Sequence, residues 1–255
     1  MLMSMIHFLS CSPPSLETYT LFDMNMIALQ GDDFFMGGAP PIAQPVHRIS
    51  WNHAYWIADI EITQQTYEFV TNINPSEERS ASFPVSNILW TEALEFCNSL
   101  SKLEDKTPCY TNISTHDAEW SLDCDGYRIP TEAEWEYAAQ SQYNLMYSGS
   151  SEPTDVGWFR EETQKAHIPR QKNRNQWGLY DMSGNVSEWV FDGYLPYEAL
   201  PYLYDIRHIH TPNRISRGGS WSDYSIDSPI SNRSVDGNEW RFPWIGFRIV
   251  RTRSQ

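Results

Sequence analysis

The chain has 255 residues, of which 40% are hydrophobic and 14% aromatic, and this composition predicts a well-packed globular protein. Its 33 acidic residues outnumber its 18 Lys and Arg residues, which gives a formal net charge of −15. Such a charge repels nucleic acids and anionic membrane surfaces, so both are excluded as partners. No apolar run reaches the roughly 20 residues that a transmembrane helix needs.

The first 25 residues are expected to form an N-terminal extension to a single domain over residues 26–255. The opening residues, MLMSMIHFLSCSPPS, have a short apolar stretch without Lys or Arg, which makes a weak secretory signal. Cys11 nevertheless lies where a truncated lipoprotein signal would have its cysteine. The sequence therefore leaves two compartments open, the cytoplasm and the cell surface.

Two segments have the spacing of apolar residues that is typical of amphipathic helices. Residues 61–73 are predicted to form one helix with Thr63 as its N-cap, and residues 90–105 a second helix that begins from Thr91. The apolar residues expected near one face of each helix are Tyr67, Val70 and Ile73 in the first and Leu94, Cys97 and Leu100 in the second.

Residues 128–140 carry the strongest helix signal of the chain. Thr131 is expected to cap the helix, and Glu134 stands three residues later, where it can complete a capping box. Glu132 and Glu136 lie one helical turn apart, and we expect both to be solvated charges on a surface helix, where they stabilise its N-terminus.

Cys109 and Cys124 bracket a polar segment that could be a β-hairpin. Four cysteines are too few for a disulfide scaffold, and they lack the close paired spacing of a zinc site. Two alternatives follow: a hairpin closed by a disulfide in an oxidising compartment, or two reduced and buried thiols.

Most of the remaining chain is rich in Gly, Pro, Asn and Asp, with short strand-like runs at 53–59 and 246–251. Gly218 and Gly219 follow another such run, which indicates a tight backbone turn beside a ligand. The sequence thus predicts an α+β, loop-rich protein with few helices and short antiparallel strands.

These segments together resemble the formylglycine-generating enzyme (sulfatase-modifying factor) family over about residues 26–251. The resemblance implies a C-type-lectin-like fold elaborated with long loops. Its motifs are FFMGG (34–38), EITQQTYEFV (61–70), PVSNILWTEALEFCNSLS (84–101), GYRIPTEAEWEYAA (126–139), NQWGLYDMSGNVSEW (175–189), RGGSW (217–221) and GFRIVR (246–251).

The family's oxidases bind copper(I) through two cysteines downstream of the GGS motif, at or near positions that are Asp223 and Ser228 here. No cysteine follows Cys124, and oxygen ligands hold Cu(I) poorly. We therefore expect no copper and no formylglycine-generating activity. His208 and His210 could face the same way on a strand, but without a third metal ligand they are interpreted as polar loop residues.

The resemblance also implies a structural calcium ion in the loop DMSGNVSEW. Carried over from the family, its ligands are the side chains of Asp181 and Glu188 and the backbone carbonyls of Gly184 and Val186. Hard oxygen donors in a glycine-bent loop suit Ca²⁺. The alternative is a β-turn in which Glu188 accepts hydrogen bonds from neighbouring backbone amides.

The residues between Trp221 and the GFRIVR motif mix aromatic rings with small polar side chains, as recognition surfaces do. Trp240 and Trp244 could alternatively be core residues. We place a ligand-binding segment at 217–251, with the contact residues Ser222, Asp223, Tyr224, Ile226, Asp227, Ser234, Val235, Asp236, Gly237, Trp240, Phe242 and Trp244.

This segment resembles the variable proteins of diversity-generating retroelements. In those proteins, a C-terminal segment that ends just before a GFR motif is rewritten at adenines, so that a fixed backbone displays many side-chain combinations. Most residues of the segment are reachable from asparagine codons by such changes, whereas Glu239, Trp240 and Trp244 are not.

The favoured hypothesis is a non-catalytic, receptor-like protein that binds a ligand, most simply another protein, through a variable C-terminal surface. Two alternatives stay open: an oxidoreductase of the same family that acts without the copper cysteines, and a fixed scaffold protein. The sequence predicts no oligomeric state.

Overall fold

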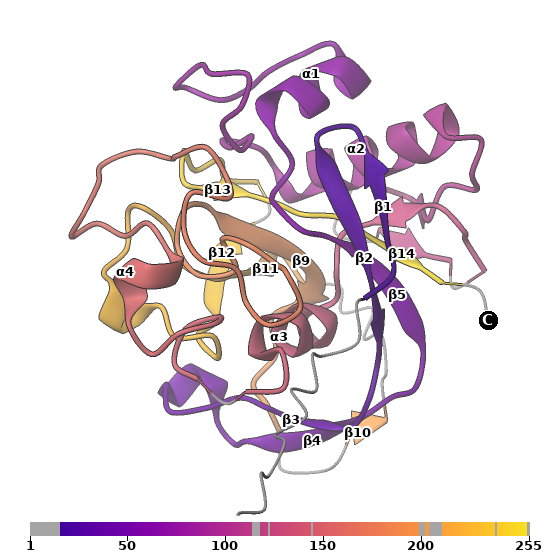
Figure 1. Ribbon diagram of the computed structural model, residues 1–255. Helices are drawn as coiled ribbons and strands as arrows, with labels where there is room; N and C mark the ends of the chain where they lie inside the picture. The colour runs from indigo at the N-terminus through magenta and orange to yellow at the C-terminus, as the bar shows by residue number, and fades with distance from the viewer. Residues whose placement is uncertain are drawn as a thin grey trace, which may run out of the picture.

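A computed structural model describes residues 16–113, 118–121, 123–143, 145–198, 202–203, 211–237 and 239–253. Short strands and few helices are joined by long loops, which confirms the predicted α+β, loop-rich architecture (Figure 1). Cys11, His208 and His210 lie outside the described residues. No helix among the described residues is long and apolar enough to cross a membrane.

The elements in chain order are β1 Thr18–Leu21, β2 Met24–Gln30, β3 Phe34–Met36, the 3-10 turn η1 Pro41–Ala43, β4 His47–Ser50, β5 Ala54–Ala58, α1 Gln64–Thr71, α2 Trp90–Leu103, β6 Tyr110–Thr111, β7 Glu119–Trp120, β8 Tyr127–Arg128, α3 Glu132–Gln140, α4 Pro153–Val156, β9 Ser187–Gly193, β10 Tyr202–Leu203, β11 Asn213–Arg217, the 3-10 turn η2 Ser225–Asp227, β12 Ser234–Gly237, β13 Ile245–Gly246 and β14 Val250–Thr252.

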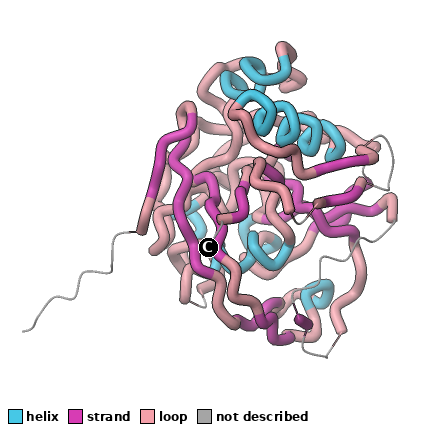
Figure 2. Tube along the Cα trace, turned by 90° about the vertical axis from the view of Figure 1, so that its right-hand side faces the viewer, coloured by secondary structure: helices cyan, strands magenta, loops and turns pink. Residues whose placement is uncertain are grey.

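The largest sheet has the strand order β1-β2-β5-β14-β8. The last strand, β14, pairs antiparallel with both β5 and β8, so the C-terminal strand lies among strands from the first half of the chain (Figure 2). The edge strand β1 pairs with β2 and begins at Thr18, ahead of the expected domain start at residue 26.

A second sheet, ordered β12-β11-β9-β13, carries the predicted ligand-binding segment. The strand expected at 246–251 is wrong as one element, because β13 ends at Gly246 in this sheet and β14 begins at Val250 in the other. Arg248 lies between these two strands in the chain. Its buried side chain donates hydrogen bonds to the backbone carbonyls of Ala58, the last residue of β5, and of Tyr180. The chain therefore changes sheets where this arginine is anchored.

The first two predicted helices are confirmed, with corrected ends: α1 ends at Thr71, so the prediction that Ile73 lies on its apolar face is wrong, and Ile73 is exposed. The Thr63 hydroxyl accepts a hydrogen bond from the Thr66 amide, so Thr63 is the N-cap of α1. The second helix begins at Trp90 rather than from Thr91. Its N-cap is Leu89, whose amide donates a hydrogen bond to the Glu92 carboxylate. All three apolar residues predicted for α2 are buried.

The capping box of α3 is confirmed, but its surface position is wrong. The Glu134 amide donates to the Thr131 hydroxyl, and the Glu134 carboxylate accepts the Thr131 amide. Glu132 and Glu136, which we expected in solvent, are buried and paired with arginines. Because α3 packs against β3, β9 and β11, its side chains are removed from water. Its carboxylates therefore pair with buried guanidinium groups instead of being solvated.

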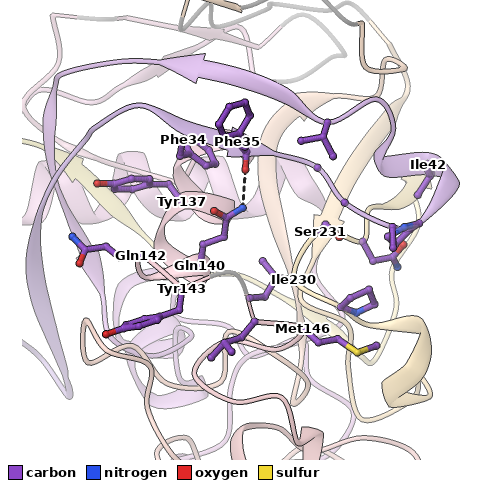
Figure 3. A pocket seen from close by; sticks show the side chains of 18 of the residues that line it. Phe34, Phe35, Ile42, Tyr137, Gln140, Gln142, Tyr143, Met146, Ile230 and Ser231 are labelled. Atoms are coloured by element: carbon purple, nitrogen blue, oxygen red, sulfur yellow. Dashed lines mark hydrogen bonds between the residues drawn. The ribbon is translucent and has the colours of Figure 1, made fainter.

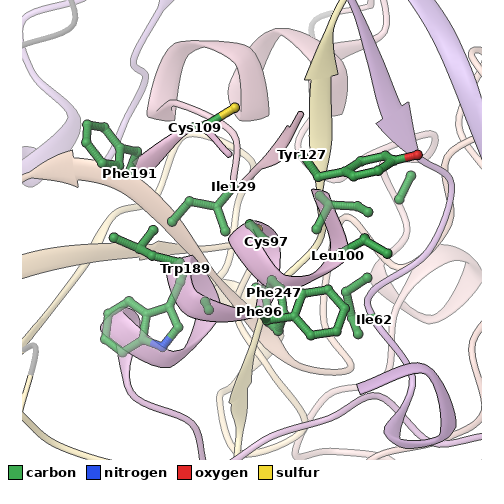
Figure 4. Packing of buried hydrophobic residues seen from close by; sticks show 14 of the residues in the cluster. Ile62, Phe96, Cys97, Leu100, Cys109, Tyr127, Ile129, Trp189, Phe191 and Phe247 are labelled. Atoms are coloured by element: carbon green, nitrogen blue, oxygen red, sulfur yellow. The ribbon is translucent and has the colours of Figure 1, made fainter. Parts of the chain in front are cut away.

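Strand β9 separates two hydrophobic cores. Trp189 and Phe191 point into a core formed with α1, α2 and the largest sheet (Figure 4). Val190, on the opposite face, joins a core with α3 and the inner face of β2 and β5. Both faces of this strand are therefore fixed, which gives the second sheet a rigid backbone.

Cys109 and Cys124 form a disulfide, and the strands β6 and β7 pair antiparallel between them. The structure thus has the first of the two predicted alternatives, a hairpin closed by a disulfide.

Candidate functional site

The glycine pair after β11 makes the tight turn that the sequence indicated. Gly218 and Gly219 have φ angles of 93° and 69°, in the left-handed region that favours glycine. A Cβ atom on Gly219 would lie 2.2 Å from the Ser228 hydroxyl oxygen, and one on Gly218 would lie 3.2 Å from the Trp135 ring. The turn therefore has no room for a side chain at position 219.

Gly219→Ala is expected to lower the free energy of unfolding by about 2–4 kcal/mol, because it adds both backbone strain and overlap with Ser228. Urea denaturation measures the change. The matched control is Gly237→Ala, whose new methyl group would lie no closer than 3.6 Å to any neighbour and should cost less than about 1 kcal/mol. Equal losses in both variants would contradict the role assigned to the turn.

Three buried arginines anchor the C-terminal segment to the rest of the domain. Arg217 donates to Glu132 at 2.8 Å and also pairs with Glu136, and Arg233 donates to Glu132 at 2.7 Å. Arg248 donates two hydrogen bonds of 2.6 Å to Glu188. We call Arg217, Arg233 and Arg248 the arginine frame.

The arginine frame also fixes the charge state of its partners. Burial alone would raise the pKa of Glu132, but the Arg233 and Arg217 guanidinium groups hold it below its usual value. The carboxylate thus stays ionised in the interior, where removal of either cation would leave a charge without full compensation.

The predicted contact residues lie on the surface that this frame supports. Tyr224, Ile226, Asp227, Val235 and Trp240 are exposed, and the exposed fraction reaches 68% for Ile226 and 64% for Trp240. The other seven are half-buried: Ser222, Asp223, Ser234, Asp236, Gly237, Phe242 and Trp244. None of the twelve is buried, so all can be reached from solvent.

Four rings of the segment form a continuous aromatic row. Ring centroids are 6.1 Å apart between Trp240 and Phe242, 5.2 Å between Phe242 and Trp244, and 6.3 Å between Trp244 and Trp221. Phe242 and Trp244 rest on the core, whereas Trp240 projects outward. Trp221 was not among the predicted contacts, although its place in the RGGSW motif could have indicated it.

A loop from the middle of the chain supports the residues around Tyr224. The Arg160 amide donates to the Asp223 carbonyl at 2.9 Å, and the Arg160 guanidinium lies 5.2 Å from the Tyr224 ring centre. The Glu161 carboxylate accepts the Ser225 amide. Sequence reasoning missed both residues, because neither belongs to a motif.

The two positions equivalent to the copper cysteines are occupied by internal hydrogen bonds. The Ser228 hydroxyl is buried and donates to the Tyr224 carbonyl, and the Asp223 carboxylate accepts from the Ser220 hydroxyl at 2.6 Å. These oxygens stabilise the turn, and neither is a soft ligand for Cu(I).

The four predicted calcium ligands lie in and just after one buried loop, and they fit a cation in part. Oδ1 of Asp181 and Oε2 of Glu61 are buried without a hydrogen-bond partner among the described residues. Both oxygens of Glu188, by contrast, accept from Arg248. The described residues contain no group of three or more His, Cys, Asp or Glu side chains arranged for a metal.

Burial and mutual repulsion perturb the acids of this loop. Burial, followed by the charge of Asp181, raises the pKa of Glu61 well above its usual value. Burial raises the pKa of Asp181 to about 6. The pair is therefore partly protonated around neutral pH unless a cation replaces the proton.

Both pKa values are raised in the folded state, so these two carboxyl groups bind more protons in the folded protein than in the unfolded chain between about pH 4 and pH 6. Their contribution to the free energy of unfolding should fall as the pH rises through this window. Asp181→Asn should flatten the fall and stabilise the protein at pH 7 by on the order of 2 kcal/mol. Urea denaturation of both proteins at pH 4.5, 5.5 and 7 tests this, and parallel curves would contradict it.

Comparisons with known proteins agree with this geometry. The family model described as sulfatase-modifying factor enzyme 1-like domain matches residues 17–253. Chaperone protein LppX of Paenibacillus barcinonensis is 31% identical over 238 residues, which cover 78% of this chain and 80% of that protein. The formylglycine-generating enzyme of Streptomyces coelicolor is 32% identical over 164 residues, 54% of this chain and 50% of the enzyme.

Among solved structures, Treponema denticola variable protein 1 superposes with a TM-score of 0.85 at 27% sequence identity. The superposition covers 94% of this chain and all of that one.

Proposed function

The chain belongs to the sulfatase-modifying factor enzyme 1-like family, and we propose that within it the protein is a non-catalytic binder that displays a variable C-terminal surface. Its formylglycine-generating-enzyme type of C-type-lectin-like fold, expected from the sequence motifs, is confirmed by the family model and by the superposition. The likeness to a variable protein over nearly the whole chain supports the favoured hypothesis over the alternatives.

One observation carries the proposal: exposed side chains alternate with buried anchors along the same segment. Tyr224, Ile226 and Val235 face solvent, while Arg217 and Arg233 are held in the interior by carboxylates of α3. Because the anchors fix the backbone, the exposed residues can change without loss of the fold. A rigid frame under changeable side chains is what a diversified binder requires.

An oxidase without the copper cysteines is the weaker alternative, because Asp223 and Ser228 already hydrogen-bond to the turn. A fixed scaffold would have no need to expose Ile226 and Trp240 to this extent, since exposed apolar area of this kind favours association. A protein ligand suits the aromatic row, because rigid rings supply contact area at low entropic cost.

The disulfide between Cys109 and Cys124 favours an oxidising compartment, and we place the protein outside the cytoplasm. A thiol assay on denatured protein purified from its native host tests this placement. Two reactive thiols before reduction and four after it would support the bridge, whereas identical counts before and after reduction would contradict it.

Calcium remains a proposal for the loop around Asp181. A cation there would take the unpartnered oxygens of Asp181 and Glu61 and the backbone carbonyls of Gly184 and Val186, while Glu188 stays with Arg248. Millimolar calcium should then raise the midpoint of thermal unfolding in the wild type and have no effect in Asp181→Asn. An unchanged midpoint in the wild type would contradict the calcium site. Asp181 and Glu61 would then be neutralised by protons rather than by a cation.

The binding proposal is tested with two displayed libraries. The first randomises Tyr224, Ile226, Asp227, Val235 and Trp240, and the second randomises the exposed α1 region at Phe69 and Ile73. Most members of the first library should remain protease-resistant, and selection on immobilised lysozyme as the probe should yield binders from it alone. Loss of folding in the first library, or binders from both, would overturn the proposal.

A further inference from the structure

A groove is formed in part by the C-terminal segment, and none of the four rings of the aromatic row lines it. Its three walls are residues 32–46, which include β3 and η1, residues 140–143 and 145–146 at the end of α3 and beyond it, and residues 226–232 of the C-terminal segment. Its volume is about 1340 Å³, above the roughly 300–1,000 Å³ of most small-molecule pockets. The size therefore fits several side chains of a polypeptide.

Apolar side chains stand exposed along the walls of this groove. Phe35 is 66% exposed, and Ile226 on another wall is 68% exposed. Tyr143 and Met146 lie opposite Phe35 and Ile42, as seen in Figure 3. A partner segment that covers these side chains would gain free energy from the apolar area removed from water.

The charges in the groove have a single sign. Asp32, Asp33 and Asp227 line it, and the lining includes no Lys, Arg or His. Arg48 pairs with Asp33 from outside the lining, and no ion pair within the described part of the chain involves Asp32 or Asp227. Since an apolar wall strengthens the field of a nearby carboxylate, the groove favours a cationic side chain.

The edge of β3 does not offer backbone hydrogen bonds to an added strand along its whole length. The Gln140 side chain donates to the Phe35 carbonyl, and the Gly37 amide donates to Glu136. These contacts, one of which is drawn in Figure 3, cover the edge with side chains of α3. Recognition in the groove must therefore act through side chains rather than by strand addition.

We propose that this acidic groove binds a polypeptide segment of a partner protein in which Lys or Arg stands beside apolar residues. The inference rests on the proposed function, because Ile226 and Asp227 belong to the predicted variable surface. It adds two walls from outside that segment, at 32–46 and at 140–143 with 145–146. The partner is thus contacted by changeable and unchanging residues together, and Asp32 and Asp227 set the preference for a cation.

The test uses the full chain and three fluorescent ten-residue peptides that share their Leu and Phe positions. One carries two Arg residues, the second citrulline in their place and the third Glu. Fluorescence anisotropy should show the Arg peptide binding at least about tenfold more tightly than the Glu peptide, with a difference that shrinks as salt is added. Equal affinities for the three peptides would overturn the proposal.

Substitutions locate the binding. Phe35→Ala and Asp227→Asn should each weaken the Arg peptide about five- to tenfold, whereas Phe69→Ala, an exposed phenylalanine of α1, should leave its affinity unchanged. Equal losses in Phe35→Ala and Phe69→Ala would also overturn the groove.

The two proposals can fail separately. If the libraries yield binders while the peptides do not discriminate by charge, only the groove is wrong. If the Arg peptide binds in the groove while the libraries yield no binders, the groove stands and the variable surface is wrong.

Discussion

Arg217→Met lowers the free energy of unfolding by about 3–5 kcal/mol, the usual cost of removing one member of a buried ion pair. The methionine fills most of the space, so the loss reports the uncompensated charge of Glu136 and the reduced compensation of Glu132, which keeps only Arg233, rather than a cavity. Urea denaturation at pH 7 measures it.

The matched control for this substitution is Arg241→Met. Arg241 pairs with Glu92 at the surface, where an ion pair contributes about 0–1 kcal/mol. Adding Glu136→Gln to Arg217→Met should restore part of the loss, because it removes one of the unpaired charges. A loss as small as that of Arg241→Met would mean that the arginine frame does not hold the segment.

Tyr224→Ala combined with Trp240→Ala should abolish ligand binding. Each ring exposes half or more of its surface, and each should contribute about 2 kcal/mol as a binding anchor, so the pair is expected to weaken binding about 1,000-fold. Neither ring lies in the core, so the free energy of unfolding should change by less than about 1 kcal/mol.

Surface plasmon resonance with the partner that the wild type retains from host surface extracts measures this loss. Phe69→Ala, with a ring that is 62% exposed on α1, is the control and should bind like the wild type. Undiminished binding in the double variant would place the ligand elsewhere on the molecule.

Local sequence signals were sufficient for the helices and for the turn of the site. The capping residues Thr63 and Thr131 act within one helical turn, so their roles follow from spacing alone. The glycine pair was recognisable because only glycine accepts its backbone geometry. The solvent accessibility of the segment at 222–244 was also predictable, since polar residues between aromatic ones favour the surface.

Long-range pairing was not predictable in the same way. Glu132 and Glu136 have the spacing of a solvated helix face, and the distant Arg217 and Arg233, more than 80 residues along the chain, make their burial possible. The split of residues 246–251 between two sheets depends likewise on a distant contact, the buried ion pair between Arg248 and Glu188. Whether a charged side chain is buried depends on ion-pair partners that lie far away in the sequence, and a local sequence pattern does not indicate these partners.

The acidic groove was missed for the same reason. Its walls come from three separated parts of the chain, and only residues 226–232 belong to the segment that the sequence indicated as ligand-binding. Phe35 alternates with buried neighbours in a strand, as any surface residue of a sheet would. A binding role for Phe35 is indicated only by the tertiary structure, in which Ile226 and Met146 line the same groove.

Sequencing the genomic DNA that flanks the gene tests the diversified surface most directly. We expect a second, adenine-rich copy of the segment encoding residues 217–251 beside a reverse transcriptase gene. Mismatches should fall at adenines in codons for exposed residues such as Tyr224, Ile226 and Val235, and the codons of Arg217 and Arg248 should be identical in both copies. Absence of such a copy, or mismatches spread equally over the buried arginines, would contradict the proposal that this family member displays a diversified surface.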